Sequence, residues 1–291
     1  MTAPVTTGMA LALPRAGALT DALTAPATAV VPAEALALLQ AEVARDLAAV
    51  VDDLPEGERL RFDAFRFALA REHPERVGAD GGPFVPSPVR CRRAVGLNAV
   101  ARCLRGGSPT PATAVAEVLA AGVEDATDAV DPTVRPPWWA GWYGSLSAGG
   151  RAMVEAEAVT WATQLWTALE WEQLGPTTVG GGDDWWDCPR SRHLTLRGQA
   201  DVRVRAGGRP VLLVVGGGVP PSDWRRPLGY PALVAALARG ERSVPARVVG
   251  LWPASGQVRI LPVDHGVLVD TAAAVVDAVA VWVRRRDLPS R

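Results

Sequence analysis

The chain contains 291 residues, of which 48% are hydrophobic and 21% are charged, and its formal net charge is −1 at pH 7. This composition is typical of a globular protein and excludes disorder over most of the length, while the size favours two packed units over one. The balanced charge excludes a global field that would draw the whole molecule to nucleic acid or to an anionic membrane. Binding of that kind would require local clusters of charge.

All 30 basic residues are arginine. Arginine stays protonated at any working pH, whereas a buried lysine can lose its proton and act as a base or as a Schiff-base nucleophile. The chain therefore cannot use a catalytic lysine.

Residues 1–32 are rich in Ala, Thr and Pro, and their first basic residue is Arg15, so they predict a loose tail and not a secretory signal. Cys91, Cys103 and Cys188 match neither a disulfide framework nor a zinc half-site, and we expect them to be small buried hydrophobes. No run is long and uncharged enough to span a bilayer, which predicts a soluble cytoplasmic protein without a membrane partner.

Residues 33–135 are expected to be helical, because apolar residues recur there at helical spacing. The predicted helices are Ala33–Val51, Glu56–Glu72, Ala94–Leu104 and Pro111–Ala121, the last with Thr110 as its N-cap. The pattern dissolves between Asp125 and Pro137, which predicts a boundary between a helical first half and a mixed second half.

Residues 136–291 are expected to form an α/β domain that begins with a long helix, Ala148–Leu174. Trp161, Trp166 and Trp171 lie on this helix; stacking on bases is one reading of them, but clamping the helix into a core is favoured. Gly180–Asp184 is expected to be a flexible loop.

Beyond this loop the apolar period changes to two, which predicts strands. The predicted strands are Leu194–Arg197, Ala200–Val204, Pro210–Val215, Ala246–Leu251 and Gln257–Val263. A helix over Tyr230–Arg239 separates the third strand from the fourth, and a final helix capped by Asp270 runs to Val283. This order predicts an α/β sandwich with a mixed sheet.

The same order resembles the PD-(D/E)XK nuclease superfamily, in particular its RecB-like branch of actinobacterial type. Gly198 and Asp201 match the strand that carries an aspartate after a glycine. The run Leu212–Gly218 falls where the family has its acid-x-lysine strand, and Tyr230 falls where the family has a tyrosine-bearing helix. The resemblance implies a restriction-endonuclease-like mixed sheet flanked by helices, preceded here by an all-helical N-terminal region.

The resemblance also implies where a nuclease site would lie. Asp201 would be the metal ligand, helped by Glu157 or Glu155 from the long helix, but Val214 stands at the acid position and Gly216 at the lysine position. Neither can hold a hard divalent cation or activate a water molecule. We therefore expect a catalytically inactive nuclease-like protein, a pseudoenzyme that acts as a binding or scaffolding module and needs no cofactor.

An alternative is a metal-dependent DNA nuclease with a non-standard active site, which would use Mg²⁺ or Mn²⁺ at Asp201 with Glu157 and His193. A second alternative is a phosphate-binding turn at Gly216–Gly218, although the third glycine of the dinucleotide-binding fingerprint would fall at Pro221.

Arginine clusters offer a nucleic-acid surface, because guanidinium groups bind phosphate in bidentate fashion. The residues expected to form it are Arg90, Arg92, Arg93, Arg102 and Arg105. A protein partner for the helical half is the other possibility, and the oligomeric state stays open.

Overall fold

The computed structural model describes residues 16–26, 30–77, 87–127, 136–180, 182–216 and 218–286. Its α-helices are α1 (Ala16–Thr24), α2 (Ala33–Val51), α3 (Ala64–Glu72), α4 (Pro88–Leu104), α5 (Pro111–Thr127), α6 (Ala140–Ser145), α7 (Ala148–Thr167), α8 (Arg225–Arg239) and α9 (His265–Arg286). Its strands are β1 (Leu60–Asp63), β2 (Thr178–Val179), β3 (Asp184–Asp187), β4 (Leu194–Gly198), β5 (Val202–Ala206), β6 (Arg209–Val215), β7 (Arg247–Trp252) and β8 (Gln257–Pro262).

The strands form two mixed sheets. The larger sheet has the order β2-β5-β6-β7-β8, with β6 parallel to β7 and the other neighbours antiparallel. The smaller sheet has the order β1-β4-β3, with β1 parallel to β4. A parallel pair requires a long crossover, and α8 provides it between β6 and β7. The expected mixed α/β class is confirmed, but the prediction of one mixed sheet is wrong, because β4 pairs with β1 and β3 in a sheet of its own.

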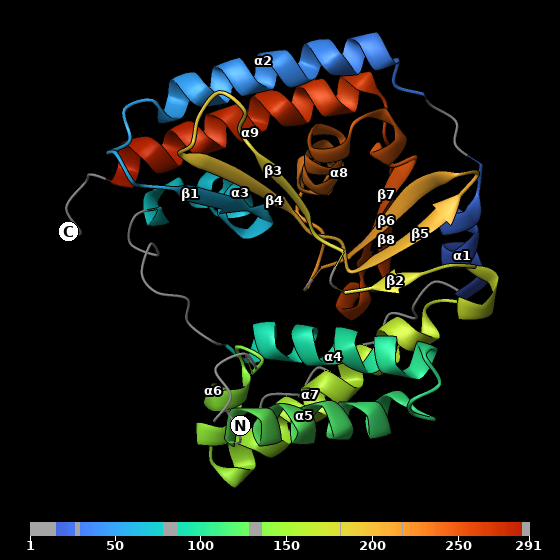
Figure 1. The fold of residues 1–291 in the computed structure, drawn as a ribbon. Helices are drawn as coiled ribbons and strands as arrows, with labels where there is room; N and C mark the ends of the chain where they lie inside the picture. Colours follow the sequence, from blue (N-terminus) through green and yellow to red (C-terminus); the bar gives the residue numbers. More distant parts are fainter. Residues whose placement is uncertain are drawn as a thin grey trace, which may run out of the picture.

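Strand β6 divides the molecule into two hydrophobic cores, because successive side chains of a strand point to opposite faces. Leu212 and Val214 pack into the core that contains α2, α8 and α9. Val211, Leu213 and Val215 pack into the core that contains α4, α5 and α7. Figure 1 shows α2 and α9 side by side over one face and the group of α4, α5 and α7 on the other side of the larger sheet.

The expectation of an all-helical N-terminal region is wrong at β1, which lies inside the predicted helix Glu56–Glu72. Residues 60–63 pair in register with residues 194–197 of β4. The physical reason is burial of Phe62, which has no exposed surface and whose carbonyl accepts a hydrogen bond from the Tyr230 hydroxyl at 2.8 Å. Helix α3 begins only afterwards, where the Asp63 side chain accepts from the Arg66 N–H at 2.9 Å.

The prediction of a loose tail over residues 1–32 is wrong for residues 16–24, which form α1. Leu19 and Leu23 are buried against the larger sheet. Arg247 of β7 donates to the carbonyl of Ala22 at 3.1 Å and to that of Ala25 at 2.6 Å, and it thereby satisfies the C-terminal end of α1. Residues 1–15 and 27–29 lie outside the described part of the chain.

Several other boundaries differ from the prediction: α4 begins earlier, at Pro88, α8 begins earlier, at Arg225, α5 extends to Thr127, and β5 runs over Val202–Ala206. Helix α7 ends at Thr167, and the short 3₁₀ helix η2 (Trp171–Gln173) follows it, so the predicted helix Ala148–Leu174 is too long. Strand β3 begins at Asp184, inside the expected loop. Helix α9 begins at His265, where Asp264 accepts from the Val267 N–H at 2.8 Å, so Asp264 and not Asp270 caps it.

Helix α9 contradicts the expectation that no segment could span a bilayer. Its residues 265–285 are long and apolar enough by length and composition. Burial explains that apolar character, because α9 packs against α2, α3 and α8 and carries core residues such as Leu268 and Val275. The three cysteines are free and buried, as expected.

Candidate functional site

Asp201 lies directly before β5 and is fully enclosed, with no exposed side-chain surface. Because β5 begins at Val202, the N–H of Val215 on β6 extends past the end of its neighbouring strand. The Asp201 carboxylate takes the place of that strand, since its Oδ2 accepts from the Val215 N–H at 2.7 Å. The backbone N–H of Asp201 donates to the Leu213 carbonyl at 2.8 Å, which continues the ladder on the same edge. Asp201 therefore completes the hydrogen bonding of β6.

Arg93 of α4 occupies the remaining positions of the same carboxylate. Its Nε donates to Oδ1 of Asp201 at 2.8 Å, and its Nη2 donates to Oδ2 at 2.9 Å. This bidentate arrangement matches the planar fork of a guanidinium to the two oxygens of a carboxylate. The pair joins α4 to the larger sheet across 108 positions of sequence. A residue expected to bind nucleic acid thus neutralises the residue expected to bind metal.

Glu157, the second expected acid, lies on α7 and makes a single contact with a different arginine. Its carboxylate lies 3.3 Å from Nη1 of Arg92, and both side chains are partly exposed. Arg92 and Arg93 are adjacent on α4, so the structure directs two of the predicted arginines to the two predicted acids. The acids do not converge on a shared open space.

Gly216, at the position of the family's lysine, is covered by the indole of Trp252. A Cβ atom added to Gly216 would lie 2.2 Å from Nε1 of that ring, and one added to Gly250 would lie 2.4 Å from its Cζ3. Trp252 therefore needs glycine at both places. The Val214 side chain, at the acid position, packs against the hydrophobic core.

These residues do not fit a site for Mg²⁺ or Mn²⁺. Such cations require several oxygen ligands. Both oxygens of Asp201 already accept hydrogen bonds from Arg93, and Val214 and Gly216 carry no side-chain oxygen. Within the described ranges, no group of three or more His, Cys, Asp or Glu side chains is arranged to hold a metal ion.

His193 and Tyr230 also lie outside any shared site with Asp201. His193 precedes β4 and its Nδ1 lies 2.7 Å from the Glu58 carbonyl. At about 3.3 Å per residue, this end of β4 is separated from Gly198 by roughly 16 Å. Tyr230 is buried beside Phe62 and Phe67, and this burial raises its pKa well above the ordinary value. Its role is in the core.

The other predicted nucleic-acid arginines are spread along α4. Arg90 lies over the ring of Phe65, with 4.9 Å from its guanidinium carbon to the ring centroid. Arg102 donates from Nε to Glu117 at 2.5 Å. Hydrogen bonds from Ser108 and Arg102, in that order of effect, lower the pKa of the Glu117 carboxyl. Arg105 is exposed at the C-terminal end of α4.

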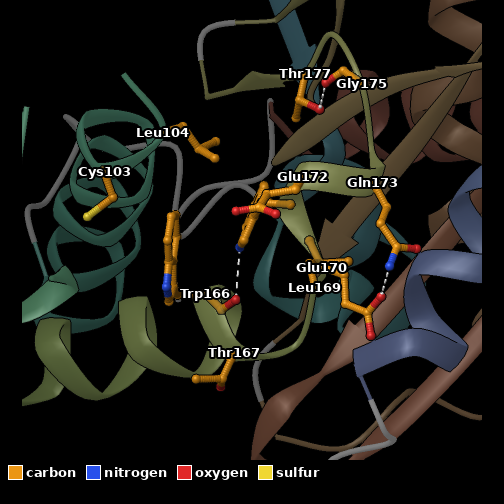
Figure 2. A pocket seen from close by; sticks show the side chains of 11 residues that line it. Cys103, Leu104, Trp166, Thr167, Leu169, Glu170, Glu172, Gln173, Gly175 and Thr177 are labelled. Atoms are coloured by element: carbon orange, nitrogen blue, oxygen red, sulfur yellow. Dashed lines mark hydrogen bonds between the residues drawn. The ribbon is translucent and has the colours of Figure 1, made fainter. Parts of the chain in front are cut away.

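An open pocket of about 970 Å³ lies between the ends of α4 and α7 and the segment that follows α7 (Figure 2). Trp166 and Trp171 stack along it, with ring centroids 5.6 Å apart and an interplanar angle of 22°. Trp171 is fixed because its Nε1–H donates to the Trp166 carbonyl at 2.8 Å. We call this the tryptophan pocket. The expectation that these two indoles clamp the helix into a core holds only in part, since both rings reach the pocket.

The tryptophan pocket is acidic and contains no activated thiol. Its lining includes Glu170 and Glu172 and no basic residue. Cys103 lies at its edge, where burial, reinforced by the Glu117 carboxylate, raises the pKa of the thiol. A thiol with a raised pKa is a poor nucleophile near neutral pH.

Comparison of the chain with protein-family models, with curated proteins and with solved structures gives no match.

Proposed function

We propose that this chain is a non-catalytic binding module built on a restriction-endonuclease-like core. The arrangement of elements supports the proposal: after α7 and the strands β2, β3 and β4, the antiparallel pair β5 and β6 is followed by α8 and then by β7, which is parallel to β6. The PD-(D/E)XK resemblance places its helix, aspartate strand, acid-x-lysine strand and tyrosine-bearing helix in the same order.

The observation that carries the proposal is the bidentate pair of Arg93 with Asp201. Nuclease chemistry of this type requires carboxylate oxygens that are free to hold a cation. Here a guanidinium, which stays charged at any working pH and cannot act as a base, holds both oxygens of a carboxylate that has no exposed surface. Trp252 in addition covers the position of the lysine. In this proposal the pair of Arg93 and Asp201 is a structural joint between α4 and the larger sheet.

The proposal does not assign nucleic-acid contact to α4. Arg92, Arg93 and Arg102 are engaged with carboxylates, and a phosphate backbone would have to displace those partners. Contact with a partner would then come from other surfaces of the molecule.

The test combines metal titration with DNA cleavage. Isothermal titration calorimetry with Mg²⁺ and with Mn²⁺, and incubation with supercoiled plasmid and single-stranded DNA, are carried out on wild type and Asp201→Asn. Asp270→Asn, which removes an exposed carboxylate from α9, is the matched control. We expect no cleavage and the same metal heats for all three proteins.

Cleavage by wild type and Asp270→Asn that Asp201→Asn lacks would overturn the proposal. It would favour the alternative of a metal-dependent DNA nuclease with a non-standard active site.

A further inference from the structure

A second pocket, of about 350 Å³, lies at the edge of the larger sheet and is walled by arginine. Strands β2 and β5 form one side, and the end of α8 with the 3₁₀ helix η3 (Glu241–Ser243) forms the other. Its lining residues include Arg203, Arg205, Arg239 and Arg242, and none of its lining residues is acidic. We call it the arginine pocket.

Two of these guanidinium groups are fixed by one buried carboxylate behind the wall. Asp184 of β3 is 1% exposed, and its Oδ2 accepts from Nη2 of Arg203 at 2.5 Å. Nε of Arg239 lies 2.9 Å from Oδ1, within ion-pair distance, although Oδ1 has no partner with hydrogen-bond geometry. A single negative charge therefore holds two positive ones in place. The wall of the pocket therefore keeps a net positive charge, and the buried Asp184 carboxylate fixes the position of these two arginines.

The other two guanidinium groups are exposed. Arg205 is anchored at the β5–β6 turn by donation to the Gly208 carbonyl at 3.2 Å, and Arg242 lies on η3. Together the wall has four guanidinium groups against the one carboxylate of Asp184. Positive charges held together at a concave surface raise the local concentration of anions. The hydroxyl groups of Thr177, Thr178 and Ser243 add neutral donors to the same lining.

We propose that the arginine pocket binds a phosphate or diphosphate group. Guanidinium groups recognise phosphate oxygens in bidentate fashion, and several of them around one concave site favour a compact dianion or polyanion over a carboxylate. The volume lies near the lower end of about 300–1,000 Å³ that small-ligand sites span, which fits one or two phosphate groups and not a duplex.

The adjoining tryptophan pocket extends the same site. Thr177 lines both pockets, so the organic part of a phosphorylated ligand can reach the partly exposed rings of Trp166 and Trp171. The acidic residues there exclude a second phosphate from that side. The proposal stands on the chemistry of this pocket and does not depend on whether the chain cleaves DNA.

The experiment measures binding of inorganic pyrophosphate by isothermal titration calorimetry at low ionic strength. Three variants accompany the wild type. Arg205→Gln/Arg242→Gln removes the two exposed charges of the wall. Thr178→Trp fills the pocket without a change of charge. Arg61→Gln/Arg190→Gln is the control, because it removes two exposed arginines that do not line the pocket.

We expect the first variant to bind pyrophosphate at least tenfold more weakly and Thr178→Trp to lose binding, while the control binds like the wild type. Circular dichroism checks that each variant is folded. Absence of binding by the wild type at 1 mM pyrophosphate, roughly the weak limit of specific affinity, would overturn the proposal. Equal loss in the first variant and the control would also overturn it, because net charge alone would then explain the binding.

Competition identifies the source of the phosphate. An oligonucleotide with a 5′-phosphate that displaces pyrophosphate, where the same oligonucleotide with a 5′-hydroxyl does not, assigns the pocket to a nucleic-acid end. Displacement by neither, with pyrophosphate binding retained, assigns it to a small phosphorylated molecule. Equal displacement by both would refute a pocket for a terminal group, because backbone charge would then be sufficient.

Discussion

Replacement of Arg93 by methionine tests whether the joint between α4 and the larger sheet is the main use of Asp201. The substitution leaves a carboxylate without solvent exposure and with the Val215 N–H as its remaining donor. Removal of one partner of a buried ion pair costs about 3–5 kcal/mol. The Arg93 side chain is 40% exposed, so solvent screens part of the interaction, and we expect the lower end, about 3 kcal/mol.

Arg92→Met is the matched control, because it changes the adjacent residue of the same helix in the same way. Arg92 pairs with Glu157 at 3.3 Å in a partly exposed position, and pairs of this kind contribute about 0–1 kcal/mol. The assay is urea unfolding at pH 7, followed by far-ultraviolet circular dichroism and by tryptophan fluorescence. A difference of about 2 kcal/mol or more between the two variants would support the joint.

A rescue variant separates the effect of the unpaired Asp201 charge from the effect of lost packing by the Arg93 side chain. In Arg93→Met/Asp201→Asn the side chain at position 201 is neutral and can still accept from the Val215 N–H. We expect it to regain about 1–2 kcal/mol relative to Arg93→Met, because the buried carboxylate no longer carries an unpaired charge. If Arg93→Met costs no more than Arg92→Met, or if the double variant is less stable than Arg93→Met, the reasoning about Asp201 is wrong.

Two further predictions concern stability. Gly216→Ala places a Cβ atom 2.2 Å from Nε1 of Trp252 and should destabilise the protein by about 1–3 kcal/mol in urea unfolding. The control is Gly149→Ala in α7, which has open space around it and should be neutral or stabilising. Equal effects of the two substitutions would refute the contact between Gly216 and Trp252. Burial raises the pKa of the Cys91 thiol to about 11 and that of the Tyr230 hydroxyl well above its ordinary value. The folded state therefore keeps protons that the unfolded state releases, and stability should fall as the pH rises above about 9. Cys91→Ala should flatten the loss between pH 8 and 10.5, and a profile identical to that of the wild type would contradict the assignment.

The fold was predictable where a local pattern decides the structure. The apolar run at β6 and the alternation at β4 and β5 predict strands that the structure contains, and α2 has the predicted bounds Ala33–Val51. The errors arise where a distant partner decides. Phe62 sits in a segment with helical periodicity, yet β4, more than 130 positions away in the sequence, draws residues 60–63 into a sheet. Periodicity within a window contains no information about such a partner.

The candidate site was predictable as a set of positions and not as a set of contacts. The sequence shows that Val214 and Gly216 stand where the resemblance would place an acid and a lysine, and this can be read from residue types alone. The sequence does not show that Arg93 reaches Asp201 or that Trp252 covers Gly216, because each pair is formed by packing between separate elements. The arginine pocket could not be predicted from the sequence for the same reason, since its walls come from three separate segments of the chain.

The absence of lysine has a physical consequence at two buried carboxylates. Within the described part of the chain, the two fully buried carboxylates are Asp184 and Asp201, and each is held by arginine. A lysine is a point charge, whereas a guanidinium satisfies both oxygens of a carboxylate in one plane and stays charged when buried. At Asp201 this fork uses both oxygens of the carboxylate and leaves nothing for a cation. At Asp184 one carboxylate is shared between two arginines, so positive charge remains and faces a pocket. Pairing between arginine and a buried carboxylate therefore leaves no oxygen for a cation at Asp201, and it leaves positive charge available for an anion beside Asp184.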